Sequence, residues 1–126
     1  MDKKLNISFD LDGTLNGTDS SFFKIMTHLL HPEVNIYILT SREPGTESKI
    51  ADELEKLNIF YHKIIITDKK EDFIKSNDIT VVFENEDEIC QNLGKETLVL
   101  KIREEGNYEY KTGRWIGSKK TVKMID

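Results

Sequence analysis

Cysteine is scarce in this 126-residue chain, which contains only Cys90. A single cysteine excludes a disulfide framework and a zinc site built from several cysteines, and it makes the reducing cytoplasm the expected location. Long apolar runs are also missing, since no stretch approaches the roughly 20 residues of a membrane-spanning helix. The apolar stretch behind the charged N-terminus ends at Asp10, too soon for a secretory signal. We therefore expect a protein without membrane contact.

Positive charge is in deficit, with 18 Lys and Arg against 23 Asp and Glu and a formal net charge of −5. This balance argues against a general nucleic-acid-binding protein. The last 26 residues reverse it, because they hold seven basic and four acidic side chains. Two interpretations of this basic end stay open: a solvated edge of the domain, or a surface that faces an anionic substrate.

Apolar residues make up 37% of the chain and gather in five runs of strand length. The runs are Leu5–Phe9, Val34–Leu39, Ile64–Thr67, Ile79–Phe83 and Thr97–Ile102. Several are nearly continuous rather than alternating, which is typical of parallel strands buried on both faces. The order of elements predicts an α/β domain with a three-layer, Rossmann-like fold and a five-stranded, mainly parallel sheet.

Helical patterns separate these runs. Their predicted ends are Asp19 or Ser20 to Pro32, Pro44 to Asn58, a short helix capped by Asp68, and Glu86 to Gly94 as a left-handed cap. Residues 107–117 predict a C-terminal hairpin that turns at Thr112-Gly113. Because we find no linker and no repeat, one domain is expected to cover residues 1–126.

Polar residues follow the predicted strands, where ligands bind in open α/β sheets. They are Asp10 and Asp12 after the first strand, Thr40, Ser41 and Arg42 after the second, Lys69 and Lys70 after the third, and Glu84 and Asn85 after the fourth. Two carboxylates held close together repel each other, and a divalent cation relieves that repulsion. Oxygen ligands suit Mg²⁺, whereas hydroxyl and lysine donors suit the oxygens of a phosphoryl group.

Four of these segments resemble the motifs of the haloacid dehalogenase superfamily. Residues 7–15, Ile-Ser-Phe-Asp-Leu-Asp-Gly-Thr-Leu, are similar to its first motif, and residues 36–42, Ile-Tyr-Ile-Leu-Thr-Ser-Arg, to its second. Lys70 resembles the lysine of the third motif, and Phe83-Glu84-Asn85 resembles the fourth. The resemblance covers about residues 5–102 with the motifs in the expected order.

The resemblance implies a role for each matched residue. Asp10 would be the nucleophile that forms an aspartyl-phosphate, and Asp12 would be the general acid and then the base. Thr40 would bind a phosphoryl oxygen, and Lys70 would neutralise charge on the nucleophile. Mg²⁺ would be held by the Asp10 carboxylate, the Asp12 backbone carbonyl and the fourth motif.

The sequence also departs from the pattern. Asn85 stands where the fourth motif usually has a second acid, so either Glu84 or Asn85 is the expected metal ligand. Lys69 competes with Lys70 for the third-motif role, and Ser41, Arg42 and Lys69 are further candidates for contact with the substrate. The intervals between motifs are too short for a cap domain, which implies a small capless phosphatase with an open site.

These observations predict a Mg²⁺-dependent phosphomonoester hydrolase. Nucleotides or the phosphorylated ends of polynucleotides are the favoured substrates, and a homodimer that covers the open site is a further expectation. The alternative is a catalytically weak or inactive relative that binds phosphate or regulates, a possibility that Asn85 keeps open. A third possibility is a protein that acts only within a complex and docks through its basic end.

Overall fold

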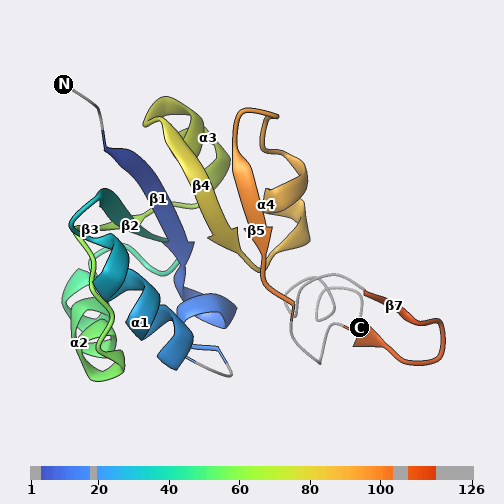
Figure 1. Ribbon diagram of the computed structural model, residues 1–126, viewed down its shortest axis with the longest axis horizontal. Coiled ribbons are helices and arrows are strands. Elements are labelled where there is room, and N and C mark those ends of the chain that lie inside the picture. Colours follow the sequence, from blue (N-terminus) through green and yellow to red (C-terminus); the bar gives the residue numbers. More distant parts are fainter. Residues whose placement is uncertain (1–3, 18–19, 104–107, 116–126) are drawn as a thin grey trace.

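Five parallel strands form the centre of the protein. A computed structural model describes residues 4–17, 20–103 and 108–115. The strands are β1 (Leu5–Asp10), β2 (Val34–Thr40), β3 (Lys63–Ile66), β4 (Ile79–Glu84) and β5 (Leu98–Lys101). They lie in the order β3-β2-β1-β4-β5 with every pairing parallel (Figure 1). This arrangement confirms the predicted α/β sheet.

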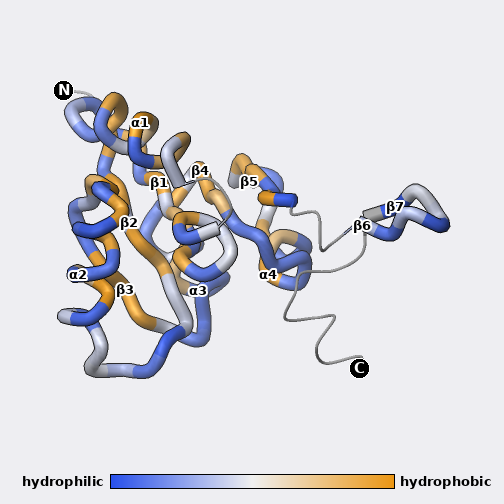
Figure 2. The backbone as a smooth tube through the Cα atoms, turned by 90° about the horizontal axis from the view of Figure 1, so that it is seen from below, coloured by the Kyte–Doolittle hydropathy of each residue, from blue (hydrophilic) through white to orange (hydrophobic). Residues whose placement is uncertain are grey.

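Helices cover both faces of this sheet. They are α1 (Ser21–Leu30), α2 (Glu47–Leu57), α3 (Lys70–Ser76) and α4 (Asp87–Gln91). Alternate residues of one strand pack on opposite faces: Ile36 and Ile38 of β2 join the cluster that includes α1 and α2, whereas Leu39 packs with Ile74 of α3. Figure 2 shows the resulting hydrophobic character along β2 and β3.

An aromatic cluster fixes the centre of the sheet beside the predicted site. The rings of Phe9 and Phe83 stack with centroids 4.6 Å apart, and Phe23 of α1 meets both of them edge-on. Phe9 and Phe83 are also paired in the register of β1 and β4. Because Asp10 and Glu84 are the next residues along these strands, the cluster brings the two carboxylates to the same edge.

The C-terminal hairpin is present. Its strands are β6 (Tyr108–Glu109) and β7 (Arg114–Trp115), which pair antiparallel, and Gly113 turns the chain with a φ of 68°. Figures 1 and 2 place the hairpin beyond α4, away from the sheet. Residues 107, 116 and 117 of the predicted hairpin lie outside the described residues.

Gly94 does not cap α4, so that prediction is wrong. The helix ends at Gln91, and the side-chain amide of Asn92 donates to the carbonyl of Glu88 at 2.9 Å. This hydrogen bond satisfies a terminal carbonyl group and ends the helix before Gly94. The predicted end of the second helix at Asn58 is confirmed, because α2 ends at Leu57 and Asn58 follows it in a left-handed conformation with a φ of 57°.

Two predicted helix starts also differ from the structure. Helix α3 begins at Lys70, so Lys69 rather than Asp68 stands at the cap position, and no side chain caps the helix. The backbone N–H of Lys69 donates to the hydroxyl of Thr67 in the preceding loop. Helix α2 begins at Glu47, since Gly45 turns the chain with a φ of 85° and leaves Pro44 outside the helix. Both changes leave the segments before α2 and α3 as loops at the carboxyl ends of β2 and β3. None of the helices among the described residues has the length and the apolar composition that spanning a lipid bilayer requires.

Candidate functional site

The segment after β1 forms one irregular helical turn, η1 (Leu11–Leu15). Gly13 has a φ of 83°, a conformation that side chains other than glycine rarely adopt. The turn directs the hydroxyl of Thr14 back to Asp10, where it donates to Oδ2 at 3.3 Å. The Asp-Leu-Asp-Gly-Thr sequence therefore folds so that its first carboxylate is supported by its last hydroxyl.

Lys70 joins two buried carboxylates. Its Nζ lies 2.6 Å from Oδ1 of Asp10 and 3.1 Å from Oε1 of Glu84. The three residues are buried, with exposures of 2%, 6% and 2% for Lys70, Asp10 and Glu84. Lys69 is exposed to solvent at the preceding position. The structure thus brings Lys70, and not Lys69, to the candidate nucleophile.

This cluster holds two negative groups and one positive group. Burial raises the pKa of Asp10 to about 7, with Lys70 opposing the shift and Glu84 adding to it. Burial works to lower the pKa of Lys70, but the carboxylates of Asp10 and Glu84 raise it above its usual value. Lys70 is therefore expected to stay protonated, and the ionised cluster has one negative charge in excess that a cation or a proton would neutralise.

The two candidate metal ligands after β4 have different surroundings. Besides its contact with Lys70, Glu84 accepts hydrogen bonds at Oε2 from the backbone N–H groups of Asn85 and Glu86, at 3.0 and 3.1 Å. Asn85 is also buried, but its Oδ1 has no hydrogen-bond partner in the structure. A buried polar atom without a partner is costly. Both Glu84 oxygens are thus engaged, whereas the Asn85 oxygen is available to a ligand.

Three kinds of oxygen could hold a hard cation at this edge: the Asp10 carboxylate, the backbone carbonyl of Asp12 and the side-chain amide of Asn85. Within the described ranges, no group of three His, Cys, Asp or Glu side chains is placed to hold a metal ion. A metal here would need this mixed set of donors. The unpartnered Asn85 oxygen and the excess negative charge both fit such an ion.

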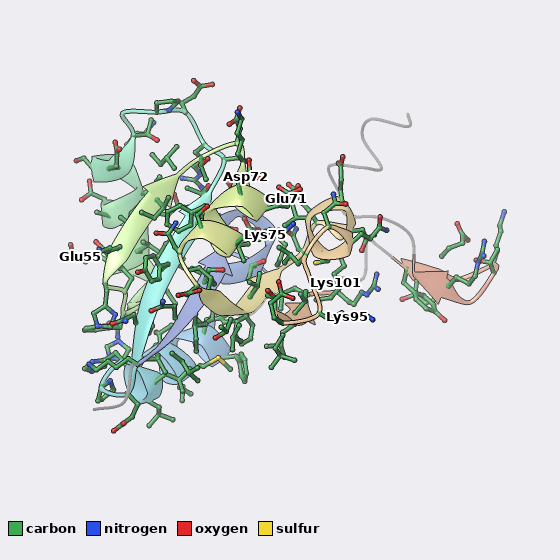
Figure 3. All side chains as sticks on the ribbon, turned by 90° about the horizontal axis from the view of Figure 1, so that it is seen from above. Glu55, Glu71, Asp72, Lys75, Lys95 and Lys101 are labelled. Atoms are coloured by element: carbon green, nitrogen blue, oxygen red, sulfur yellow. The ribbon has the colours of Figure 1, made fainter. Side chains whose placement is uncertain are left out.

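Lys101 and Asp87 hold the turn that carries Asn85. The ammonium group of Lys101, which Figure 3 labels, donates to the backbone carbonyl of Asn85 and lies 2.8 Å from a carboxylate oxygen of Asp87. Arg103 pairs with the same carboxylate at 3.6 Å. These two basic residues of the C-terminal region therefore have ion-pair partners beside the candidate site.

Arg42 binds the second aspartate of the first motif. Its Nε and Nη2 donate to the two carboxylate oxygens of Asp12 at 3.0 and 2.7 Å. The same guanidinium donates to both oxygens of Glu53 in α2 at 2.7 and 3.0 Å. The hydrogen bonds from Arg42 hold the pKa of Asp12 below its usual value. This arrangement consequently favours the ionised form of Asp12 over the protonated form.

Two members of this network were not predicted from the sequence. Asn16 donates to Asp12 at 3.0 Å and to Glu53 at 3.1 Å, so it bridges the two acids that Arg42 holds. Glu53 belongs to the polar side of an amphipathic helix, where its acidic neighbours have the same sequence signature. No pattern in the sequence distinguishes it as a partner of Arg42.

Thr40 and Ser41 are adjacent in the sequence but differ in burial and in surroundings. Thr40 is 1% exposed; its hydroxyl accepts from the backbone N–H of Arg42 at 3.4 Å, and its carbonyl accepts from that of Thr67 at 2.8 Å. Ser41 is exposed and lines a pocket of about 370 Å³ between the loops that follow β2 and β3. The structure therefore divides the predicted site into three parts: the Asp10 cluster, the Asp12 network and this pocket.

Comparisons with known proteins give no relative from which a function could be transferred. No family model matches the chain, and neither does any curated protein or solved structure.

Proposed function

We propose that the protein is a Mg²⁺-dependent phosphomonoester hydrolase of the haloacid dehalogenase type, which acts through an aspartyl-phosphate on Asp10. The observation that carries the proposal is the buried cluster of Asp10, Lys70 and Glu84 at the carboxyl end of the sheet. A buried carboxylate with a raised pKa and a lysine partner, placed where open α/β sheets bind ligands, supports a catalytic role more strongly than a structural one.

In the first step, a carboxylate oxygen of Asp10 attacks phosphorus and the bond to the leaving oxygen breaks. Lys70 holds Oδ1 of Asp10, and Thr14 supports Oδ2 with a longer hydrogen bond. A carboxylate and a phosphate dianion repel each other, so the ammonium group of Lys70 reduces the cost of their approach. The leaving oxygen takes its proton from Asp12.

In the second step, Asp12 removes a proton from water, and the resulting hydroxide attacks the phosphorus of the aspartyl-phosphate. The acyl-phosphate bond breaks, which releases phosphate and restores the Asp10 carboxylate. Arg42 favours the ionised form of Asp12, which is the form that this step uses. The first step needs the protonated form, so Arg42 is expected to limit donation to the leaving oxygen.

The residues that would hold Mg²⁺ are Asp10, Asp12 through its carbonyl, and Asn85 through Oδ1. When bound, the ion would supply positive charge that reduces the repulsion between the nucleophile and the phosphoryl oxygens. Glu84 is not proposed as a ligand, because Lys70 and two backbone N–H groups occupy its oxygens.

Phosphate release tests the proposal. The purified protein is assayed against p-nitrophenyl phosphate, sugar phosphates and nucleotides, with Mg²⁺ and with EDTA. We expect Mg²⁺-dependent turnover that falls roughly 100-fold or more in Asp10→Asn, as for loss of a nucleophile. Asp52→Asn makes the same chemical change at an exposed position of α2 and should leave turnover unchanged. Turnover that survives in Asp10→Asn would overturn the proposal.

A second candidate function is phosphate binding without turnover. The observation that favours it is the neutral Asn85 in the fourth-motif position, together with an Asp12 that Arg42 keeps ionised. Calorimetric titration with inorganic phosphate in the presence of Mg²⁺ would detect it. Binding without hydrolysis of any phosphomonoester would select this alternative over the phosphatase.

Nucleotides or polynucleotide ends as substrates, a homodimer and a cytoplasmic location remain predictions that rest on the sequence. The substrate panel above addresses the first, and sedimentation velocity would measure the second.

A further inference from the structure

We propose that the pocket between the loops after β2 and β3 binds the leaving group of the substrate, and that this group is a small uncharged polyol, such as a monosaccharide. This inference rests on the proposed function and deepens it by naming the substrate class.

The pocket is built where two neighbouring strands end. Its volume is about 370 Å³, and its lining residues are Ser41, Arg42, Glu43, Pro44, Ile66, Thr67 and Asp68. Strands β2 and β3 pair through Thr40 and Ile66, and the backbone N–H of Thr67 donates to the carbonyl of Thr40 at 2.8 Å. The two loops therefore start from a fixed separation, directly beside the candidate phosphoryl-binding residue Thr40.

Arg42 connects this pocket to the proposed chemistry. Arg42 is one of the lining residues of the pocket, and its guanidinium donates to both oxygens of Asp12. Asp12 is the group that we propose as proton donor to the leaving oxygen. The pocket and that donor therefore share Arg42 as a neighbour, and we place the remainder of the leaving group in the pocket.

The charges of the lining residues disfavour a second anionic group. Glu43 and Asp68 contribute two carboxylates. The positive charge of Arg42 is already matched by its ion pairs with Asp12 and Glu53. A second phosphate, or the phosphodiester of a polynucleotide, would meet two carboxylates without an unmatched cation among the lining residues. This argument favours an uncharged leaving group and disfavours polynucleotide ends.

The hydrogen-bonding groups and the volume of the pocket restrict the chemical class of the leaving group further. The carboxylates accept from hydroxyl groups, and Ser41 can both donate and accept. Thr67 accepts from the backbone N–H of Lys69 at 3.0 Å, which leaves its own hydroxyl proton free to donate. Pro44 and Ile66 add apolar surface for the carbon face of a ring. The volume of about 370 Å³ is near the lower end for ligand pockets and suits a monosaccharide rather than a polymer.

A comparison of kcat/KM among substrates with uncharged and charged leaving groups tests the inference. We would measure kcat/KM for glucose 6-phosphate, fructose 1,6-bisphosphate and a 5′-phosphorylated oligonucleotide. The monosaccharide monophosphate should exceed the other two by about tenfold or more, since like charges in the pocket oppose them. Asp68→Lys should reverse the order by removing a carboxylate and adding a cation. Asp72→Asn, at an exposed position of α3 that Figure 3 labels, should preserve it.

A binding measurement keeps the test decisive for a protein with slow turnover. In the Asp10→Asn variant with Mg²⁺, titration with glucose 6-phosphate should shift the amide resonances of Ser41 and Thr67, and fructose 1,6-bisphosphate should bind more weakly. Turnover that depends on Asp10 but shows no preference, or a preference that Asp68→Lys leaves unaltered, would overturn the pocket assignment alone. The absence of shifts at Ser41 and Thr67 would also overturn it. Turnover that does not depend on Asp10 would instead overturn the proposed function.

Discussion

In the absence of a metal ion, ionisation of Asp10 should lower the free energy of unfolding substantially. Burial raises the pKa of this carboxyl group from 3.8 to about 7. The folded state therefore binds a proton more tightly than the unfolded state does, and the stability that the proton supplies is lost as pH rises through about 7. Asp10→Asn removes the titration and keeps a side chain of the same shape, so this variant should be more stable than the natural protein at high pH.

The magnitude follows from the shift. A difference of roughly three pKa units at about 1.4 kcal/mol per unit gives an upper limit of about 4 kcal/mol for the contribution of this proton to the free energy of unfolding. In EDTA, the free energy of unfolding of Asp10→Asn, minus that of the natural protein, should increase by about 1 kcal/mol for each pH unit between about pH 5 and pH 7. The substitution also changes the surroundings of Lys70, but the pKa of Lys70 is raised above its usual value and lies far outside this pH range, so the increase is assigned to Asp10.

Urea unfolding in EDTA at several pH values measures this difference. Asp12→Asn is the matched control, since it makes the same change two residues away, where Arg42 lowers the pKa instead. Asp12 is more than half exposed, so this control should lose no more than about 1 kcal/mol. Mg²⁺ should stabilise the natural protein and reduce the advantage of Asp10→Asn. A difference that stays constant with pH, or that falls as pH rises, would refute the reasoning.

Three further predictions use the same contacts. Lys70→Met leaves two buried carboxylates without their cation and should cost about 3–5 kcal/mol in urea unfolding, whereas Lys69→Met should cost under about 0.5 kcal/mol; equal losses would contradict the buried cluster. Arg42→Gln should raise the pKa of Asp12 and move the basic limb of the kcat/KM profile to higher pH, and an unmoved limb would exclude Asp12 as the acid. Asn85→Asp should tighten Mg²⁺ binding about tenfold by calorimetry, and weaker binding would count against Asn85 as a ligand.

The fold could be predicted because its signals are local and repeated. Each strand is a short apolar run, and parallel strands that alternate with helices leave few possible topologies. The rule that ligands bind at the carboxyl ends of strands then predicted that Asp10 and Glu84 lie at the same edge of the sheet, without information about their contacts. Phe9 and Phe83 show how this works, since the packing of each fixes the position of the acid that follows it.

The contacts of individual side chains could not be predicted in the same way. Lys69 and Lys70 are adjacent in sequence, and only the position at which α3 begins decides which of them points to Asp10. A shift of one residue in a helix rotates the side chain by about 100°, which exceeds what helix boundaries read from sequence can resolve. Glu53 presents the same difficulty, because many acids could have paired with Arg42 and only the angle between α2 and the loop after β2 selects one.

A neutral residue at position 85 is consistent with the charges of the neighbouring buried cluster. The ionised cluster of Asp10, Lys70 and Glu84 already carries one excess negative charge in a buried setting. A carboxylate at position 85 would be a second excess charge whenever the metal is absent, and desolvation would oppose its ionisation. The amide of Asn85 instead offers an oxygen to a cation at no cost in charge, although it leaves Oδ1 unpartnered. On this argument, the proposed metal site would bind its cation more weakly than a site with two acids, but it would stay folded without the cation.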